Sequence, residues 1–317
     1  MNQLGIVRER LKKVRPIRAL GNAYRIHQTL SILKPYQDFD LRRIEGKYVL
    51  TYTDRFGYKP DHLSASFFFD YNRRLWQVEL NGLVILTFGC PLFELIVELR
   101  GYLLACPLAL GDVVLDVGAS TGFITSVFAR TVGLDGRVIA LEPDPVSAQA
   151  LRKTLRINAL QNCVVLNCAL SNRSGTVSWI SAGGASHIGL SNHAVADLAE
   201  VETISIPALL ERVPDLRADR LRLIKLDVEG DEVAVLDDLL QLLKGNRQIV
   251  VAIASYHLLR GQPTYHWIEE RCRAAADIVA RTIYPVHTTT ILVHRDNRSV
   301  INRLNALPAY EDYAHFA

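Results

Sequence analysis

The segment Asp112-Val-Val-Leu-Asp-Val-Gly-Ala-Ser-Thr-Gly-Phe-Ile-Thr-Ser-Val127 contains the pattern that decides the fold. Its apolar, largely β-branched residues between Val113 and Val117 predict a buried strand of a parallel sheet. Gly118 and Gly122 then allow a tight turn and a close approach of the backbone to a ligand. A helix over 123–132 would point its free N–H groups into that turn. The segment therefore predicts a strand, a turn and a helix that together form one wall of a small-molecule site.

The same alternation of strand and helix continues to the end of the chain. Strands are expected at 113–117, 137–141, 163–166, 221–226 and 249–254, with a closing pair at 283–285 and 289–293; a further short strand is expected at 176–180, and helices at 123–132, 146–158, 232–243 and 264–280. This alternation predicts the α/β class, with a mostly parallel seven-stranded sheet and helices on both of its faces.

Polar residues lie at the C-terminal ends of several of these strands. They are Asp116, Glu142, Asn167 and Asp227. Ligands of open parallel sheets bind beyond the C-terminal ends of the strands, so these side chains are expected to converge on one site.

The first 105 residues are predicted to form an accessory region, and residues 106–317 the ligand-binding domain. A helix is expected over 1–35, an irregular segment over 36–65, and a helix that begins at Pro91 and ends near Ala105. Two apolar runs, 75–80 and 83–88, flank Asn81-Gly82. Because Asn-Gly suits the positive φ angles of a type I′ turn, these runs predict a β-hairpin.

The composition indicates a globular protein of a reducing compartment. Hydrophobic residues make up 49% of the 317 residues and charged residues 22%. No run approaches the ~18 consecutive apolar residues of a membrane span, and the N-terminus lacks the apolar core of a signal peptide. The five cysteines form no C-x-x-C pair, which argues against a disulfide framework and a zinc site. We therefore expect a cytoplasmic protein, and a net charge of +3 is too small to indicate nucleic-acid binding.

Positive charge is concentrated near the N-terminus. Residues 1–34 contain eight Lys and Arg residues and one acid, Glu9, and apolar residues recur at helical spacing through the first part. Two interpretations stay open: a solvated helix that packs on the domain, and a basic amphipathic helix that contacts an anionic membrane surface at the cytoplasmic face.

The glycine turn itself allows more than one chemistry. Gly118-Ala-Ser-Thr-Gly122 has the letters of the nucleophile elbow of hydrolases, with Ser120 as nucleophile and Asp227 with His257 or His287 as its partners. That interpretation gives no reason for Asp116 before the turn or for Glu142 after the next strand. No Lys-Ser or Lys-Thr pair closes the turn as in a phosphate-binding loop.

S-adenosylmethionine fits this pattern better. An Asp-x-Gly-x-x-x-Gly turn followed by an acid at the end of the next strand suits it, because the Glu142 carboxylate can accept hydrogen bonds from both ribose hydroxyls. Asp116 would then lie near the ammonium group of the methionine part, or would cap the turn.

Four segments resemble the FkbM-type methyltransferases. They are GDVVLDVGASTGFIT, GRVIALEPDP, the NCALSNRSG region with Asn158, and IKLDVEGDEVAVLDDL, of which the stretch from Leu226 to Glu232 is the most specific to that family. The resemblance covers roughly residues 90–255. It implies a Rossmann-like class I fold and an S-adenosylmethionine-dependent enzyme. Because characterised members of that family are mainly O-methyltransferases, the resemblance also implies methyl transfer to oxygen.

The resemblance also implies a set of site residues. The cofactor would be held by Asp116, Gly118, Ala119, Ser120, Thr121, Gly122, Phe123, Glu142, Pro143, Asn167, Ala169 and Asp227, with the turn from Asn167 to Ala169 beside the adenine and Asp227 near the reacting centre. The family usually has a Glu at the end of the fifth strand, where this chain has Ala-Ile-Ala-Ser-Tyr256-His257. The methyl acceptor, or the base that deprotonates it, is therefore expected to differ from that of relatives.

Methyl transfer to a hydroxyl requires alignment of the reacting atoms and removal of a proton. His257 follows a strand on the same edge as Asp227, so these two are the predicted catalytic residues; His187 and His193 are rival bases. As alternatives, Asp227, Glu229 and His257 would bind Mg²⁺, or Asp227 and Glu229 would cap a helix that starts at Glu232. The prediction without a metal is the one we favour.

The sequence therefore predicts S-adenosylmethionine-dependent O-methylation of a hydroxyl on a glycan, a lipid head group or a secondary metabolite. The alternative is a non-catalytic protein of the same fold that docks on a membrane through its basic N-terminal helix.

Overall fold

A computed structural model describes residues 26, 30, 39–52, 64–103, 106–180, 187–188, 198–214, 216, 219–228, 231–283 and 288–306. The predicted N-terminal helix therefore lies outside the described residues, except for Ile26 and Leu30. Membrane contact through residues 1–34 stays a prediction. Within the described part of the chain, no helix is long and apolar enough to cross a membrane.

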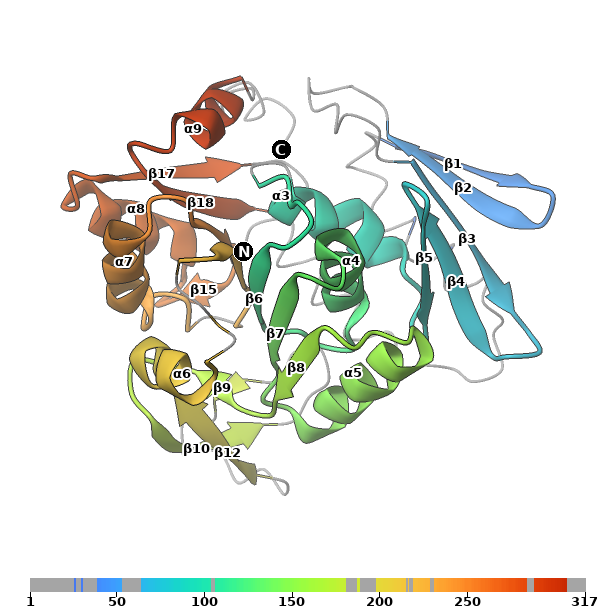
Figure 1. Cartoon of the computed structure of the whole chain (residues 1–317), viewed down its shortest axis with the longest axis horizontal. Coiled ribbons are helices and arrows are strands. Elements are labelled where there is room, and N and C mark those ends of the chain that lie inside the picture. The colour runs from blue at the N-terminus through green and yellow to red at the C-terminus, as the bar shows by residue number, and fades with distance from the viewer. Residues whose placement is uncertain are drawn as a thin grey trace.

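The centre of the molecule is a sheet in which all strands but one run in the same direction (Figure 1). Its members are β6 (Val113–Val117), β7 (Arg137–Leu141), β8 (Cys163–Leu166), β13 (Leu221–Leu226), β14 (Val250–Ala254), β17 (Ile278–Ile283) and β18 (Thr289–His294). They lie in the order β17-β18-β14-β13-β6-β7-β8, and β18 is antiparallel to both of its neighbours. The predicted seven-stranded, mostly parallel sheet is confirmed, since central strands buried on both faces are continuous apolar runs.

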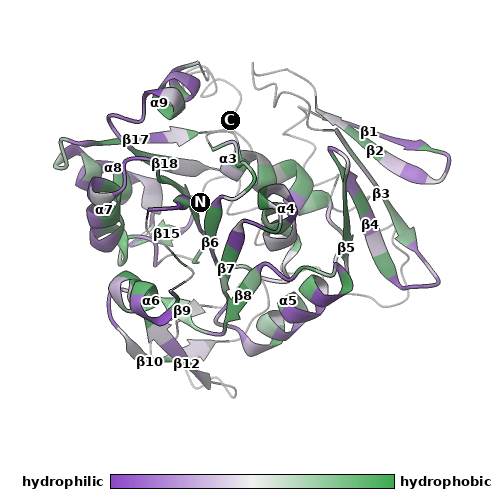
Figure 2. Cartoon of the chain, viewed as in Figure 1, coloured by the Kyte–Doolittle hydropathy of each residue, from purple (hydrophilic) through white to green (hydrophobic). Residues whose placement is uncertain are grey.

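Helices cover both faces of this sheet. One face packs against η2 (Glu94–Glu98), α3 (Leu99–Leu103), α4 (Phe123–Val132) and α9 (Arg298–Asn305), and the other against α6 (Ile206–Arg212), α7 (Leu236–Gly245) and α8 (Thr264–Arg273). Alternate strand residues separate the two cores: Val114 and Leu223 belong to the first, Leu115 and Ile224 to the second. Figure 2 shows the hydrophobic strand β6 at the centre and hydrophilic residues along the outer sides of α5 (Pro145–Ile157), α7 and α9.

Smaller elements lie beside the central sheet. A four-stranded sheet contains β9 (Ala169–Leu170), β10 (Gly175–Ile180), β11 (His187–Ile188) and β12 (Leu198–Ile204), and a short hairpin contains β15 (Leu258–Leu259) and β16 (Gln262–Pro263). The β15–β16 hairpin comes directly after His257.

Two predicted helices have different bounds in the structure. The helix expected over 232–243 begins only at Leu236, because residues 232–235 form turns. The helix expected over 264–280 ends at Arg273, and residues 278–283 form β17 instead. In the second case, Ile278–Ile283 forms a strand because it pairs along its whole length with β18. Such pairing between strands is a tertiary contact, which helix and strand propensities do not predict.

The accessory region contains more strand than the sequence indicated. It forms an antiparallel meander of β1 (Phe39–Ile44), β2 (Lys47–Tyr52), β3 (Ser64–Asp70), β4 (Leu75–Leu80) and β5 (Leu83–Thr87). The hairpin at Asn81-Gly82 is confirmed, and both turn residues have positive φ angles, 48° and 81°. The prediction of an irregular segment over 36–65 was wrong for 39–52, where Glu45 and Gly46 make an equivalent turn with φ angles of 48° and 84°.

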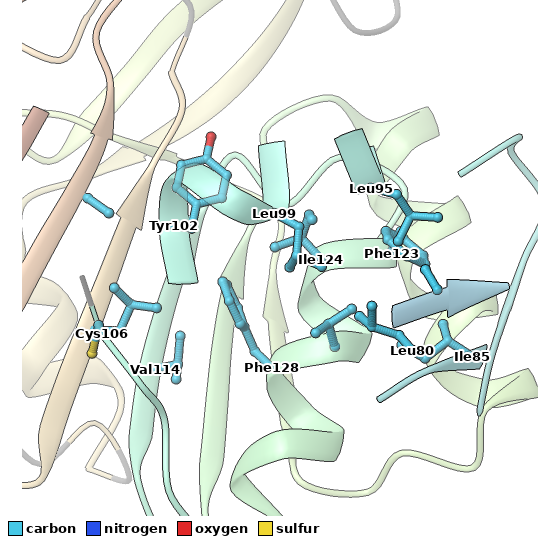
Figure 3. Close-up of a cluster of buried hydrophobic side chains, with 14 of the residues drawn as sticks. Leu80, Ile85, Leu95, Leu99, Tyr102, Cys106, Val114, Phe123, Ile124 and Phe128 are labelled. Atoms are coloured by element: carbon cyan, nitrogen blue, oxygen red, sulfur yellow. The ribbon is translucent and has the colours of Figure 1, made fainter. Parts of the chain in front are cut away.

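The meander shares a core with the central sheet. Leu80 and Ile85 come from β4 and β5, and they belong to the same apolar cluster as Phe128 of α4 and Leu99 of α3 (Figure 3). Helix α4 contacts β5 on one side and β6 and β7 on the other. The predicted division at residue 105 is not tested by this arrangement and stays a prediction.

Asn158 fastens the edge of the meander to the larger domain. Its Oδ1 accepts a hydrogen bond from the Leu86 N–H, and its Nδ2 donates to the Leu86 carbonyl, both at 2.8 Å. The same Nδ2 donates to the Thr154 carbonyl of α5 at 2.8 Å. One buried amide therefore satisfies both backbone groups of a residue on an edge strand, which would otherwise be left unpaired.

Asn158→Ala should lower the free energy of unfolding by about 1–3 kcal/mol, because it leaves the Leu86 backbone groups without partners. Urea unfolding followed by circular dichroism measures this loss. The matched control is Asn302→Ala, which removes an exposed amide from α9 and should have an effect below about 0.5 kcal/mol. Equal losses in the two variants would show that the Asn158 bonds do not stabilise the fold.

Candidate active site

The predicted site residues do converge at one edge of the central sheet. Strands β6, β7, β8, β13 and β14 are parallel neighbours, so their C-terminal ends lie along the same edge. The residues that follow them are Gly118, Glu142, Asn167, Asp227 and the segment from Ser255 to His257. We refer to this as the C-terminal edge.

The glycine turn is held by the end of the neighbouring strand. The N–H groups of Gly118 and Ala119 both donate to the Leu141 carbonyl, at 2.9 and 3.0 Å. Gly118 and Gly122 have φ angles of 76° and 89°, in the left-handed region that favours glycine. The helix predicted after this turn is confirmed as α4, with Gly122 as its N-cap residue.

The space beside these glycines is filled by the protein itself. A Cβ atom on Gly118 would lie 1.9 Å from the Asp227 carbonyl oxygen, and one on Gly122 would lie 2.5 Å from Leu151 Cδ1. The sequence suggested that these positions lack side chains so that a ligand can approach. In the structure, the close neighbours are the end of β13 and helix α5.

Gly118→Ala should therefore be far more destabilising than a substitution at a glycine with the same backbone conformation in open space. Gly46 has a φ of 84° and no atom within 4 Å of its Cβ position, so Gly46→Ala is the matched control. We expect a loss of about 1 kcal/mol for the control from backbone strain alone. For Gly118→Ala we expect more than about 4 kcal/mol, because the β13 backbone must move. Thermal unfolding of both variants tests this, and similar losses would contradict it.

Glu142 lies directly against the glycine turn. Its Oε2 accepts a hydrogen bond from the Ser120 N–H at 2.7 Å, and its Oε1 accepts one from the Asp144 N–H at 2.9 Å. Burial raises the pKa of Glu142 to about 7, although these two N–H bonds act in the opposite direction. A carboxylate offers about four acceptor positions, so each oxygen retains capacity for one more donor. These two remaining acceptor positions fit the two hydroxyl donors of a ribose.

Asn167 supports the same corner of the edge. Its Nδ2 donates to the carbonyls of Glu142 and Pro143, both at 2.8 Å. Ala169, two residues on, is buried in β9 beside Trp179. The structure thus brings Glu142, Pro143 and Asn167 together, as the sequence predicted.

Asp116 faces an ammonium group that belongs to the protein. Its carboxylate is fully buried, with Oδ1 3.2 Å from Lys225 Nζ, and Oδ2 accepts a hydrogen bond from Thr125 Oγ1 at 2.6 Å. We expected Asp116 to lie near the ammonium of the cofactor's methionine part. Instead, the buried charge of Asp116 is already compensated by Lys225.

Two further predicted cofactor residues direct their side chains into the core. Phe123 belongs to the cluster that contains α3 and the meander (Figure 3), and Ala119 packs against α5. A ligand at the turn would contact these residues through their backbone. Ser120 is exposed, with a φ of 51°, and its N–H is directed to Glu142.

A second group of polar side chains surrounds His257. Its Nδ1 lies 2.6 Å from Glu232 Oε1, and its Nε2 lies 3.5 Å from Asp227 Oδ1. The hydroxyl of Tyr102 donates to Asp227 Oδ2 at 3.3 Å. All four residues are at least nine-tenths buried. The structure places His257 in contact with Asp227, and the two have further partners, Glu232 and Tyr102, that the sequence did not reveal. Their catalytic role stays a prediction.

The missed partners come from distant segments. Glu232 lies in the turn before α7, and Tyr102 belongs to α3 of the accessory region, where its hydroxyl points away from the apolar side chains of Figure 3. The capping interpretation of Asp227 was wrong, because α7 starts at Leu236 and residues 231–235 form no helix. Glu232 is the last residue of the segment most specific to the FkbM resemblance, which is the signal that could have identified it.

Several alternatives fall partly outside the described residues. These include Glu229, His193, His287 and the side chain of His187, whose backbone is in β11. Among the residues that the structure describes, no group of three or more His, Cys, Asp or Glu side chains is arranged to hold a metal ion.

The order of the strands, with one antiparallel member near the edge and a ligand-type turn after β6, defines a Rossmann-like α/β protein of the class I methyltransferase type. Residues 116–274, half of the chain, match the sequence model of the methyltransferase FkbM domain. The chain belongs to this family, and the resemblance seen in its sequence is confirmed.

Individual relatives share low sequence identity with this chain. Protein-L-isoaspartate O-methyltransferase 1 from Arabidopsis thaliana is 28% identical over 109 residues, which cover 34% of this chain and 41% of that protein. The chain thus matches less than half of the length of that relative. The O-methyltransferase TomG from Streptomyces achromogenes has a TM-score of 0.39 at 14% identity, over 65% of this chain and 80% of that one. An O-methyltransferase from Bacillus cereus has a TM-score of 0.38 at 14% identity, over 64% and 79%.

Proposed function

We propose that the protein is an S-adenosylmethionine-dependent methyltransferase that methylates a hydroxyl oxygen. The observation that carries this proposal is the position of His257, whose two ring nitrogens face the carboxylates of Glu232 and Asp227 on the same edge of the sheet as the glycine turn and Glu142. Membership of the FkbM methyltransferase family supports the reaction class.

Glu142 and the glycine turn suit the nucleoside part of the cofactor. The open acceptor positions of the Glu142 carboxylate match the ribose hydroxyls, and the backbone of 118–122 is fixed beside it. The turn from Asn167 to Ala169 follows the next strand and would lie beside the adenine. When bound, the cofactor supplies a methyl group on a positively charged sulfur, which the neighbouring carboxylate of Asp227 would favour electrostatically.

His257 is placed to act as the general base. A hydrogen bond from Nδ1–H to Glu232 fixes the tautomer in which Nε2 carries the lone pair. Nε2 would accept the proton of the acceptor hydroxyl while the new C–O bond forms. Asp227 would stabilise the resulting imidazolium, since its Oδ1 lies 3.5 Å from Nε2. Tyr102 holds the other oxygen of Asp227 and so fixes the orientation of that carboxylate.

The acceptor is proposed to be a hydroxyl-bearing glycan, lipid head group or secondary metabolite. A base that takes one proton from a hydroxyl fits each of these classes. Methyl transfer to oxygen is also what the name of the Arabidopsis relative states for that protein.

Isothermal titration calorimetry with S-adenosylmethionine and S-adenosylhomocysteine tests the cofactor part of the proposal. We expect one site per chain with micromolar affinity for both ligands. Incubation with methyl-labelled cofactor and separate oligosaccharide, polar-lipid and small-metabolite extracts then tests the acceptor class. No binding at millimolar cofactor would overturn the proposal, and label recovered as an N-methyl product would overturn the assignment to oxygen.

A further inference from the structure

Lys225 is a buried cation beside the glycine turn, and it takes no part in the proposed proton transfer. Its side chain is 3% exposed. Nζ donates to the Gly118 carbonyl at 2.5 Å and to the Val117 carbonyl at 3.3 Å, and it lies 3.2 Å from Asp116 Oδ1. The Tyr102 ring lies over it, with its centroid 5.6 Å from Nζ.

The fold places this cation where it is fully compensated. Asp116 and Lys225 are register partners on the adjacent strands β6 and β13, so their side chains lie on the same face of the sheet. Although burial lowers the pKa of Lys225, the carboxylates of Asp116, Asp227 and Glu98 raise it above its ordinary value. Lys225 therefore remains charged, and a charge this deeply buried is retained only with such partners.

The turn is consequently fixed from two directions. On one side, the N–H groups of Gly118 and Ala119 bond to the end of β7 and that of Ser120 bonds to Glu142. On the other side, β13 contributes the Lys225 ammonium to the Gly118 carbonyl, and its Asp227 carbonyl occupies the space beside Gly118. Removal of Lys225 takes away its bonds to the Gly118 and Val117 carbonyls. The bonds of the N–H groups remain, and so does the bond from the Asp227 N–H to the Val117 carbonyl.

We infer that Lys225 is a positioning residue, which holds the turn from Gly118 to Gly122 in its ligand-binding conformation before any ligand arrives. This inference rests on the proposed cofactor site. Its physical basis is preorganisation: the apparent dissociation constant rises in inverse proportion to the fraction of molecules whose turn is in the binding conformation. The Lys225 side chain then has two effects, because it also compensates the buried charge of Asp116.

The test must separate positioning from loss of the ion pair. Lys225→Met alone leaves Asp116 buried without its cation, which destabilises the protein whatever the turn does. The double variant Asp116→Asn/Lys225→Met removes both charges at similar volume. Asp116→Asn alone breaks the same ion pair but retains the Lys225 bonds to the Gly118 and Val117 carbonyls. Arg222→Met is the control on the same strand, since Arg222 is partly exposed and bonds Gln248.

Hydrogen exchange of the cofactor-free proteins is the first readout, followed over a peptide that covers 116–126. We expect the double variant to unfold within about 5 °C of the wild type, because replacing both partners of a buried pair is often nearly neutral. Its turn amides should nevertheless exchange about tenfold faster, and its dissociation constant for S-adenosylmethionine should rise about tenfold. Asp116→Asn should keep the exchange protection of the turn, and Arg222→Met should match the wild type in both readouts.

Wild-type exchange and affinity in the double variant would overturn the inference, because Lys225 would then serve only as the counter-charge of Asp116. So would an Asp116→Asn turn that exchanges as fast as that of Lys225→Met, and this comparison remains decisive if the double variant does not fold. A wild-type protein that binds no S-adenosylmethionine would instead refute the proposed function, while the exchange comparison still tests Lys225.

Discussion

Replacement of His257 by alanine should lower the turnover number for methyl transfer by about 10²- to 10⁴-fold, the contribution typical of a general base, and should leave cofactor affinity within about twofold. The reason is the separation of roles along the C-terminal edge. His257 contacts Glu232 and Asp227, whereas the turn and Glu142 make their contacts with one another. Loss of the imidazole therefore removes the proton acceptor without disturbing the cofactor-binding turn.

Glu232→Gln should have a smaller effect in the same direction. The amide oxygen of glutamine can still accept the Nδ1–H bond, so the tautomer of His257 is kept, but the negative charge beside the imidazolium is lost. We expect a loss of about tenfold in the turnover number, in line with one charge-assisted bond replaced by a neutral one.

Single-turnover transfer of labelled methyl into the extract that accepts it measures both variants, with calorimetry for cofactor affinity. The control is His266→Ala, which removes an exposed histidine of α8 and should retain wild-type activity. An active His257→Ala variant would show that another group removes the proton. A variant that loses cofactor affinity as much as turnover would place His257 in the cofactor site.

Glu142→Ala should weaken S-adenosylmethionine binding by about 100-fold or more, because it removes the acceptor of two charge-assisted hydrogen bonds worth roughly 1.5–3 kcal/mol each. The Ser120 and Asp144 N–H groups also lose their acceptor, which loosens the turn. Calorimetry at pH 8 measures the affinity, and circular dichroism verifies the fold. Glu211→Ala, which removes an exposed carboxylate from α6, is the control and should bind as the wild type does.

The same residue should make cofactor binding depend on pH. Burial raises the pKa of Glu142 from 4.5 to about 7, so the carboxyl of the free protein is protonated below neutral pH. Two hydroxyl donors require the carboxylate, and the proton must leave before they bind. We expect affinity to be constant above about pH 7.5 and to fall by about tenfold per pH unit below pH 6.5. Affinity that is the same at pH 6 and pH 8 would exclude Glu142 as the acceptor of the ribose hydroxyls.

The free energy of unfolding should depend on pH in the opposite sense to cofactor affinity. Between pH 4.5 and 7 the folded protein retains a proton on Glu142 that the unfolded chain has lost. The folded state therefore binds more protons in this window, and the contribution of Glu142 to stability falls as the pH rises through it. Glu142→Ala should remove this dependence.

Buried strands were the most predictable part of the fold. The predicted bounds 113–117, 137–141, 163–166 and 221–226 agree with those of β6, β7, β8 and β13. Strands β6, β7 and β13 are buried on both faces, and β8 is a half-buried strand at the edge of the sheet. In all four, an apolar run marks the strand and turn residues mark its ends. The meander strands β1 and β2 were missed because their sequence, Phe39–Ile44 and Lys47–Tyr52, is half polar, and only pairing and burial of one side stabilise them.

Within the site, residues at strand ends could be predicted, whereas Lys225 inside β13 and Tyr102 in α3 were not. Asp116, Glu142, Asn167 and Asp227 follow from strand order, since parallel strands end at a common edge. For Lys225 the sequence did contain an indication, because a lysine within an apolar strand predicts a buried partner of opposite charge. For Tyr102 the sequence contained no such indication, because this residue is 125 residues from Asp227 along the chain.

The sequence by itself determined the strand–turn–helix alternation, the parallel sheet and the set of polar residues at its C-terminal edge, because local periodicity and turn chemistry specify these. Only the tertiary structure decided which of them touch. The turn beginning at Gly118 rests on the Asp227 carbonyl and the Lys225 ammonium, and His257 lies between Glu232 and Asp227. These contacts depend on the packing of neighbouring strands and of α3 against them, with distances of a few ångströms between residues far apart in the chain. Such distances are a property of the folded molecule and have no counterpart in the order of its residues.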